Sequence, residues 1–154
     1  MNIQNRTIYC KDNLDILQNI DSESVDMIYL DPPFNKNQSF TAPIGSSAKG
    51  ASFKDIFGKE DYKDEWKDEF KIEYEELYNF LESMPFYANE SDVAYIAYMA
   101  IRIIECHRIL KDYGCLFYHC DDTMQHYIKI MLDIIFGREN FINDHFCHFY
   151  MERT

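Results

Sequence analysis

The pattern of apolar and polar positions divides the chain into short apolar runs and longer stretches in which apolar residues recur every three or four positions. The short runs, at residues 6–10, 26–30, 115–119 and 146–150, predict strands. The longer stretches predict helices at residues 62–84, 91–113 and 121–136, and a shorter one near residues 14–17. Strands that alternate with helices indicate an α/β fold with a parallel sheet, in which strands 6–10 and 26–30 are neighbours.

Polar and glycine residues mark the ends of these helices. Ser91 and Asp92 can cap the second long helix, and Gly114 is its natural left-handed stop. Asp121, Asp122 and Thr123 can cap the next helix, which Gly137 ends.

Two stretches between the strands have a different character. Residues 35–58 contain three glycines and little periodicity, which predicts a long loop; because it leaves directly from the end of strand 26–30, we expect a lid. Residues 60–84 predict an acidic amphipathic helix with one apolar stripe, whose inward positions are Trp66, Phe70, Tyr74, Leu77, Leu81 and Met84.

Strand 26–30 ends at the tetrapeptide Asp31-Pro32-Pro33-Phe34. Neither proline can continue a central strand, because proline lacks the amide donor and has a fixed φ. Asp31 is therefore expected at the carboxyl end of a strand, where open α/β sheets bind ligands. An ordinary turn is the alternative interpretation of this tetrapeptide.

The chemistry of this tetrapeptide suits an amino group on a flat ring. The Asp31 carboxylate and the Pro32 carbonyl are two acceptors, a nucleobase amino group offers two N–H donors, and Phe34 can stack on the base. Acceptors on both N–H groups favour localisation of the nitrogen lone pair, and a fixed orientation toward a methyl donor supplies much of the remaining rate.

Composition changes this picture mainly through charge. The formal net charge is −12, and residues 55–92 hold thirteen acidic residues against four lysines, a net charge of −9. DNA affinity depends largely on lysine and arginine contacts with phosphates, so the chain by itself is expected to bind DNA poorly. The acidic side of the predicted helix is interpreted as a solvated face, or as a surface that repels or mimics nucleic acid.

The cysteines and histidines do not form a recognisable metal pattern. The five cysteines include no C-x-x-C pair, which favours free buried thiols over disulfides, and the spacing of His145, Cys147 and His148 matches no zinc motif. The chain has no apolar run of about eighteen residues and no apolar signal core at its start, so we expect no membrane span and a cytoplasmic protein.

Five blocks of the sequence resemble the S-adenosylmethionine-dependent DNA amino-methyltransferases in the β order of motifs. The blocks are residues 8–17 (IYCKDNLDIL), 25–34 (VDMIYLDPPF), 95–111 (YIAYMAIRIIECHRILK), 114–121 (GCLFYHCD) and 135–141 (IFGRENF). The resemblance implies a Rossmann-like methyltransferase sheet with flanking helices, S-adenosylmethionine as cofactor, and DNA as substrate.

The resemblance also implies roles for individual residues. Asp31, Pro32, Pro33 and Phe34 match the catalytic tetrapeptide, and Asp12 matches an acidic position near the adenine of the cofactor. Substrate-binding positions are Phe34 with its neighbour Asn35, and His119 and Asp121 after the later strand; local helix capping explains Asp121 equally well. Aspartate in the tetrapeptide favours adenine N6 over cytosine N4 as the target.

The chain departs from the family in two places. The family binds its cofactor with a Phe-x-Gly-x-Gly stretch, but glycine occurs here at positions 45, 50, 58, 114 and 137 alone. The segment that reads the target sequence is also missing. We therefore expect residues 1–154 to be the N-terminal, catalytic-motif portion of a methyltransferase domain with an incomplete sheet, inactive without a continuation or partner chain.

Other interpretations stay open at this point. The chain could be a non-enzymatic remnant whose acidic helix binds a DNA-binding protein, half of an N4-cytosine methyltransferase, or part of an enzyme that methylates RNA or another amino substrate. An incomplete sheet also leaves an apolar edge uncovered, which predicts self-association.

Overall fold

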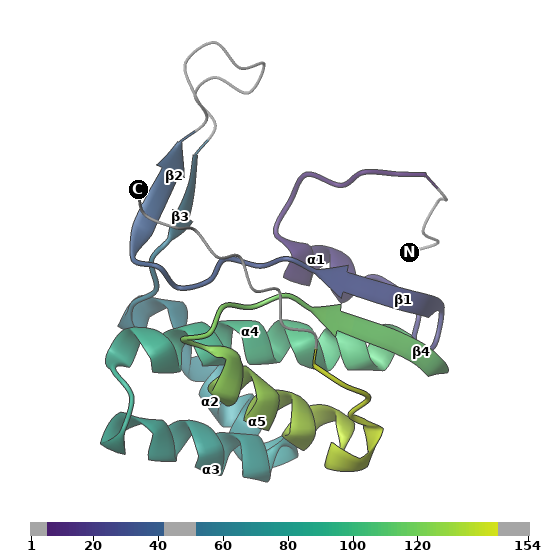
Figure 1. The fold of residues 1–154 in the computed structure, drawn as a ribbon. Helices are drawn as coiled ribbons and strands as arrows, with labels where there is room; N and C mark the ends of the chain where they lie inside the picture. Colours follow the sequence, from purple (N-terminus) through teal and green to yellow (C-terminus); the bar gives the residue numbers. More distant parts are fainter. Residues whose placement is uncertain (1–5, 42–51, 145–154) are drawn as a thin grey trace, which may run out of the picture.

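The computed structural model describes residues 6–41 and 52–144 and has a mixed α/β architecture (Figure 1). The longer elements are α1 (Asn13–Leu17), β1 (Val25–Leu30), β2 (Gln38–Thr41), β3 (Ser52–Asp55), α2 (Asp64–Glu73), α3 (Glu75–Ser83), α4 (Glu90–Ile109), β4 (Leu110–Tyr118) and α5 (Gln125–Phe136). Three short 3-10 turns, η1 (Lys59–Asp61), η2 (Met84–Phe86) and η3 (Arg138–Asn140), complete it.

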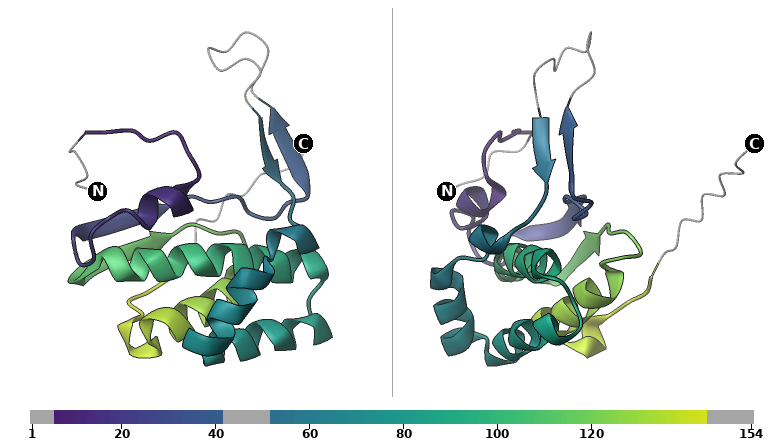
Figure 2. Two further views of the ribbon diagram at one scale, coloured as in Figure 1. Left: turned by 180° about the vertical axis from the view of Figure 1, so that it is seen from behind. Right: turned by 90° about the vertical axis from the view of Figure 1, so that its left-hand side faces the viewer.

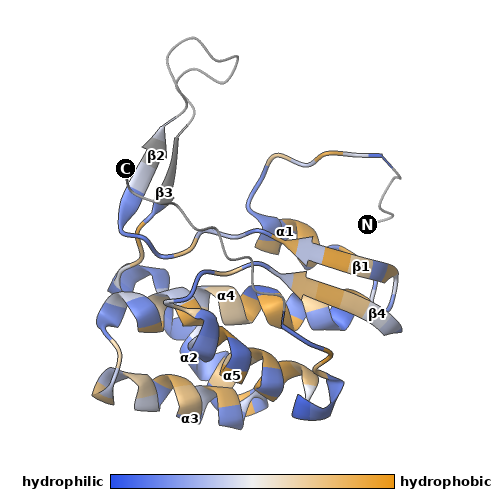
Figure 3. Ribbon diagram, in the orientation of Figure 1, coloured by the Kyte–Doolittle hydropathy of each residue, from blue (hydrophilic) through white to orange (hydrophobic). Residues whose placement is uncertain are grey.

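β1 and β4 form a two-stranded parallel sheet, with Ile28 opposite Leu116 and Leu30 opposite Tyr118. Leu30, Leu116 and Tyr118 pack against the core on the side where α4 and α5 lie. Residues of the opposite sheet face are exposed, although both strands are hydrophobic along most of their length (Figure 3). The prediction of a parallel α/β arrangement is confirmed at this level, while a Rossmann-like sheet stays a prediction.

Helix α4 is the centre of the core. Its central residues from Ala94 to Ile104 are almost all buried, and α2, α3 and α5 contribute the remaining apolar side chains. A capping box between Asn89 and Asp92 starts the helix, and β4 follows it directly at Leu110. None of the helices in the described residues is long and apolar enough to cross a membrane.

The predicted strand at residues 6–10 is wrong. None of these residues pairs with another strand, and Ile8 is almost completely exposed. β1 pairs with β4 along one edge, and its other edge has no strand partner within the described residues. A strand forms only where its backbone groups pair with a neighbour, and residues 6–10 do not pair with that open edge of β1, so their apolar pattern alone does not make them a strand.

The acidic stretch at residues 60–84 forms two helices, not the single helix that its stripe predicts. The break lies at Tyr74, whose backbone leaves the helical region (φ −136°, ψ 59°). Trp66 and Phe70 of α2, and Leu77 and Leu81 of α3, are nevertheless all buried. The apolar spacing continues through the break, and periodicity alone therefore does not reveal it.

The end of α4 also differs from the prediction. The helix ends at Ile109, and Gly114 lies inside β4, not at a left-handed helix stop. Gly114 packs closely on backbone: a Cβ there would lie 3.0 Å from the carbonyl oxygen of Lys111. Gly137, in contrast, follows α5 with φ 85° and ends that helix as predicted.

Residues 35–58 are not a plain loop, because β2 and β3 form an antiparallel hairpin in which Gln38 pairs with Asp55 and Thr41 with Ser52. The hairpin projects from the body of the molecule in every view (Figures 1 and 2). Its role as a lid stays a prediction. The strand predicted at residues 146–150 lies outside the described residues, as do His145, Cys147 and His148.

Candidate active site

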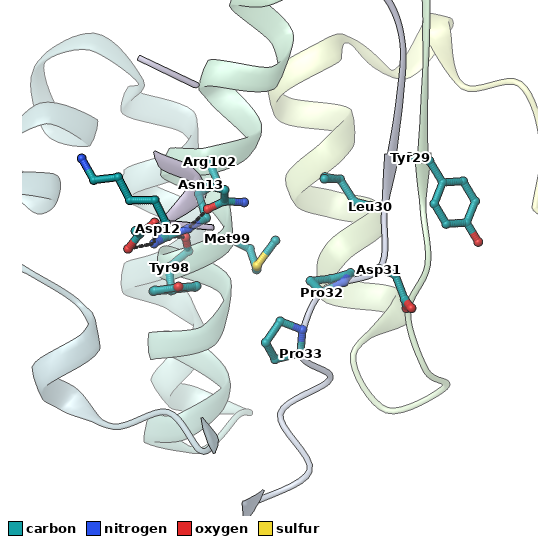
Figure 4. Close-up of a pocket in the computed structure, with 11 residues that line it drawn as sticks. Asp12, Asn13, Tyr29, Leu30, Asp31, Pro32, Pro33, Tyr98, Met99 and Arg102 are labelled. Atoms are coloured by element: carbon teal, nitrogen blue, oxygen red, sulfur yellow. Dashed lines mark hydrogen bonds and ion pairs between the residues drawn. The ribbon is translucent and has the colours of Figure 1, made fainter. Parts of the chain in front are cut away.

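The carboxyl end of β1 opens into a pocket of about 400 Å³ (Figure 4). The pocket joins two parts of the chain that the sequence places apart: the Asp31 corner and the segment before α1. Helix α4 contributes the third wall. The lining residues are Lys11, Asp12, Asn13, Tyr29, Leu30, Asp31, Pro32, Pro33, Tyr98, Met99 and Arg102.

Asp31 stands where the sequence predicts it, one residue after β1 ends at Leu30. Its carboxylate is mostly exposed and points away from Asp12 (Figure 4). Pro32 and Pro33 continue along the pocket wall, since they cannot extend the sheet. Asp31, Pro32 and Pro33 therefore line the pocket, and the Asp31 carboxylate also faces the solvent beside it.

His119 meets the tetrapeptide from the end of β4. Its amide donates to the carbonyl of Leu30 at 2.9 Å, and its ring nitrogen Nδ1 lies 2.8 Å from Oδ1 of Asp31. The Phe34 ring packs edge-on against the imidazole, with ring centroids 5.2 Å apart. The parallel pairing of β1 and β4 thus brings Asp31, Phe34 and His119 together.

Asp12 holds the opposite side of the pocket. Its carboxylate caps α1 by accepting from the amide of Leu14 at 3.0 Å, and both of its oxygens accept from Arg102 Nη2, at 3.0 and 3.1 Å. Partial burial opposes ionisation of Asp12, but the Leu14 amide and the Arg102 guanidinium outweigh it and hold its pKa below the ordinary 3.8. The side chain is half exposed, so lone pairs are left for a ligand.

Arg102 is a site residue that the sequence did not single out. It is 2% exposed, donates from Nε to Asn13 and from Nη1 to the carbonyl of Tyr98, and lies 3.4 Å above the Tyr98 ring. A charged residue inside the apolar stretch of α4, one helical turn from Tyr98, was the available signal. Asp12 and Asn13 are about ninety positions away, so their pairing with Arg102 could not be predicted from spacing.

Asn35 is engaged within the chain. Its side-chain amide donates to Asp92 at 2.9 Å, and its side-chain oxygen accepts from Ser91 at 2.7 Å, both at the start of α4. Its backbone amide donates to the buried carboxylate of Asp55 at 2.6 Å. The structure therefore places Asn35 in contacts that hold the chain after Phe34, and its role toward substrate stays a prediction.

Asp121 combines a local cap with an ion pair. Its carboxylate accepts from Thr123 Oγ1 and from the amide of Met124, and it pairs with Lys36, two residues beyond Phe34. Burial opposes ionisation, but these hydrogen bonds, led by that from Lys36, hold the pKa of Asp121 below its ordinary value. The capping interpretation holds for the turn before α5 and not for the helix itself, because the N-cap residue of α5 is Met124 and no side chain caps the helix.

The cysteines in the described residues are free, and Cys106 is buried, which raises the pKa of its thiol to about 12. Within residues 6–41 and 52–144, no group of three or more histidine, cysteine or acidic side chains could hold a metal ion. The lining of the pocket offers carboxylates, aromatic surface and a thioether, together with the cations of Lys11 and Arg102 and the amide of Asn13.

Comparison with known proteins gives the family. The DNA methylase family model matches residues 25–153. The chain is 32% identical over 137 residues to the Mod subunit of the type III restriction-modification enzyme StyLTI of Salmonella typhimurium, which covers 86% of the chain and 19% of that protein. It is 42% identical over 124 residues to the type II methyltransferase M.EcaI of Enterobacter cloacae, covering 80% of the chain and 19% of that protein.

A further relative is the type II methyltransferase M.KpnI of Klebsiella pneumoniae, 27% identical over 141 residues, which cover 90% of the chain and 25% of that protein. The chain thus spans about a fifth to a quarter of the length of these relatives. The region that the family model matches includes both the Asp31 corner and His119. The chain belongs to the N6/N4 DNA methylase family.

Proposed function

We propose that this chain is the portion of a DNA adenine methyltransferase that places a flipped adenine amino group for methyl transfer from S-adenosylmethionine. The observation that carries the proposal is the common pocket of Asp12 with Asp31, Pro32 and Pro33. Methyl transfer requires the donor and the target amino group to meet, and one pocket lined by residues of both candidate subsites supports this.

Asp31 and the Pro32 carbonyl accept from the amino group, and Phe34 stacks on the base. His119 donates from Nδ1 to Asp31, which holds the carboxylate in one orientation, and its ring supports the edge of Phe34. The Asp31 carboxylate and the Phe34 ring thus lose conformational freedom before the base enters. Such preorganisation assists a poorly nucleophilic amino nitrogen.

The residues present fit one part of the cofactor. S-adenosylmethionine carries an adenosine with N–H and O–H donors, and the half-exposed Asp12 carboxylate can accept from them beside the Tyr98 ring and Met99. When bound, the cofactor supplies the activated methyl group. No glycine-rich Phe-x-Gly-x-Gly stretch occurs in this sequence to hold its methionine end. The chain is therefore inactive alone and acts with a continuation or partner chain.

We assign DNA binding to the same continuation or partner chain. A chain with a net charge of −12 has too few cations to neutralise phosphates over a binding site. The missing part is therefore basic and carries the segment that reads the target sequence. The preference for adenine over cytosine rests on the aspartate at position 31.

A complementation assay tests the proposal. The 154-residue chain is incubated with DNA and labelled S-adenosylmethionine, alone and together with the part of M.EcaI that it does not match. We expect label in N6-methyladenine, identified by nucleoside chromatography, only in the combined reaction. Asp31→Ala should remove it, while the matched control Asp112→Ala, at an exposed strand position, should not.

Three outcomes contradict parts of the proposal. Methyl transfer by the isolated chain rules out its inactivity alone, and label in N4-methylcytosine rules out adenine as the target. Capture of an unrelated basic protein from a lysate, together with activity indifferent to Asp31→Ala, favours the non-enzymatic remnant, for which the net charge of −9 at residues 55–92 is the supporting observation.

A further inference from the structure

Asp55 is an unusual carboxylate in this structure. It ends β3, is 2% exposed, and with Arg102 makes up the buried charged residues of the described part of the chain. Arg102 is neutralised by Asp12, but no ion pair among the described residues includes Asp55. A buried carboxylate without a cation is costly unless hydrogen bonds replace its hydration, so its partners identify what it does.

Those partners are two successive backbone amides directly after Phe34. The amide of Asn35 donates to Oδ1 of Asp55 at 2.6 Å, and the amide of Lys36 donates to Oδ2 at 3.1 Å. Asn35 has φ 58°, a left-handed conformation that turns neighbouring N–H groups toward one anion. Each oxygen of Asp55 is thus committed to the chain that leaves the tetrapeptide.

Asp55 is itself held in a fixed place. Two residues later, the buried Phe57 packs against Tyr95 and Tyr98 of α4, with ring centroids 5.0 and 5.1 Å apart. Tyr98 lines the pocket. Packing on α4 therefore fixes the place of the Asp55 carboxylate, and the carboxylate in turn fixes the backbone beside Phe34.

The side chains of Asn35 and Lys36 complete this arrangement. Asn35 bonds Ser91 and Asp92 at the start of α4, and Lys36 pairs with Asp121 after β4. Of the three side chains of Asn35, Lys36 and Asp55, that of Asp55 is fully buried and accepts hydrogen bonds from backbone amides alone. Its loss would release the turn without removing any group that faces the pocket.

We propose that Asp55 is a positioning residue for the tetrapeptide, which fixes the Phe34 ring against His119 through the amides of Asn35 and Lys36. The proposal rests on the proposed function for its catalytic consequence, but its structural part is independent of it. Asp55→Asn replaces one accepting oxygen by an amide that faces an N–H donor, so one of the two hydrogen bonds is lost at nearly constant volume.

The structural part is tested on the 154-residue chain by NMR. In the wild type we expect a nuclear Overhauser contact between the rings of Phe34 and His119, and strongly downfield amide protons at Asn35 and Lys36. Asp55→Asn should lose the ring contact and the downfield position of one of these two amide protons. Asp61→Asn is the matched control, because Asp61 also accepts a backbone amide, that of Gly58 at 2.9 Å, but does not contact the tetrapeptide.

A second variant separates positioning from folding. Asn35→Gly keeps the left-handed turn and both backbone amides while it removes the contacts to Ser91 and Asp92, so it should retain the ring contact. If Asp55→Asn keeps the contact between Phe34 and His119, or if Asp61→Asn loses it equally, the proposal is overturned.

The catalytic consequence is tested in the complemented reaction. We expect Asp55→Asn to lower kcat by about tenfold to a hundredfold, as for a small displacement of a reacting group, with the KM for S-adenosylmethionine within about twofold. An unchanged kcat overturns the proposal. If the wild-type combination transfers no methyl group, the proposed function fails, and the NMR comparison still decides the role of Asp55.

Discussion

His119 and Asp31 lie 2.8 Å apart, from Nδ1 to Oδ1, although 88 positions separate them in the sequence. The contact arises because β1 and β4 are parallel neighbours, so the residues that follow them emerge at the same edge of the sheet. The tetrapeptide is therefore oriented by a residue from the other strand, and not only by its own prolines.

This contact predicts that His119→Ala lowers kcat of the complemented enzyme by about tenfold to a hundredfold, because Asp31 loses its donor and Phe34 its edge contact. His119→Asn separates the two effects, since its side-chain amide can donate in place of Nδ1 but lacks the ring. His126→Ala, on α5, is the control. Equal rates for the wild type and His119→Ala would contradict the prediction, and steady-state methyl transfer measures them.

Arg102→Met should raise the pKa of Asp12 toward its ordinary 3.8 or above, because the opposing effect of burial is left with fewer compensating contacts. A carboxyl whose pKa is lowered in the folded state adds stability above its unfolded pKa and loses it as the pH falls through the folded value. The wild type should therefore lose this contribution below about pH 4, and the variant should not show that loss.

The variant should also be less stable at neutral pH by about 1–3 kcal/mol, since hydrogen bonds to a charged group are removed from a buried position. Urea unfolding at pH 7 and at pH 3 measures both effects, and carboxyl NMR titration follows Asp12 directly. Lys111→Met is the matched control: it removes a partly exposed lysine from the exposed Asp26, whose pKa is also lowered, first of all by that lysine. A pH dependence of Arg102→Met identical to that of the wild type would refute the coupling.

Local patterns in the sequence predicted many of the helices, turns and strand ends, but fewer of the contacts between segments that are distant in the sequence. The Asp31 corner follows from strand length and proline chemistry, and Gly137 from the periodicity before it. The break at Tyr74 escaped prediction because the apolar stripe continues through it. The strand at residues 6–10 failed because an apolar pattern does not determine backbone pairing, and these residues make none although one edge of β1 is open among the described residues. A pattern reports which face a residue prefers, but pairing depends on the neighbours that the fold supplies.

The same limit applies to the site. Asp31, Phe34 and His119 follow strands and were recognisable, whereas Arg102 and Asp55 act across the fold on partners that no spacing rule connects. Both are buried charges, and such residues reveal their function only once their partners are known. Asp121 was predicted with two roles, and in the structure it accepts from the amide of Met124 in the turn before α5 and pairs with Lys36, two residues beyond Phe34.

Gly114→Ala should destabilise the chain by about 1–3 kcal/mol, because an added methyl group meets fixed backbone and forces the strands apart. Its Cβ would lie 3.0 Å from the carbonyl oxygen of Lys111 and 3.2 Å from that of Asp26. Gly58→Ala is the control, since the Cβ there meets only the flexible Glu60 carboxylate, and its effect should stay within about 0.5 kcal/mol. Urea midpoints compare them, and equal midpoints would contradict the packing argument.

The exposed face of the β1–β4 sheet should make the chain self-associate. Met27 is 60% exposed, Tyr29 65% and Phe117 47%, and the Tyr29 and Phe117 rings stack with centroids 6.4 Å apart. Parallel sheets are normally covered on both faces, so this apolar surface gains free energy by meeting another one. Combined Tyr29→Ser and Phe117→Ser should shift the chain toward monomer in sedimentation velocity, while Phe86→Ser, equally aromatic and more exposed but on η2, should not. A wild-type chain that sediments as a monomer at high concentration would show that this face does not drive association.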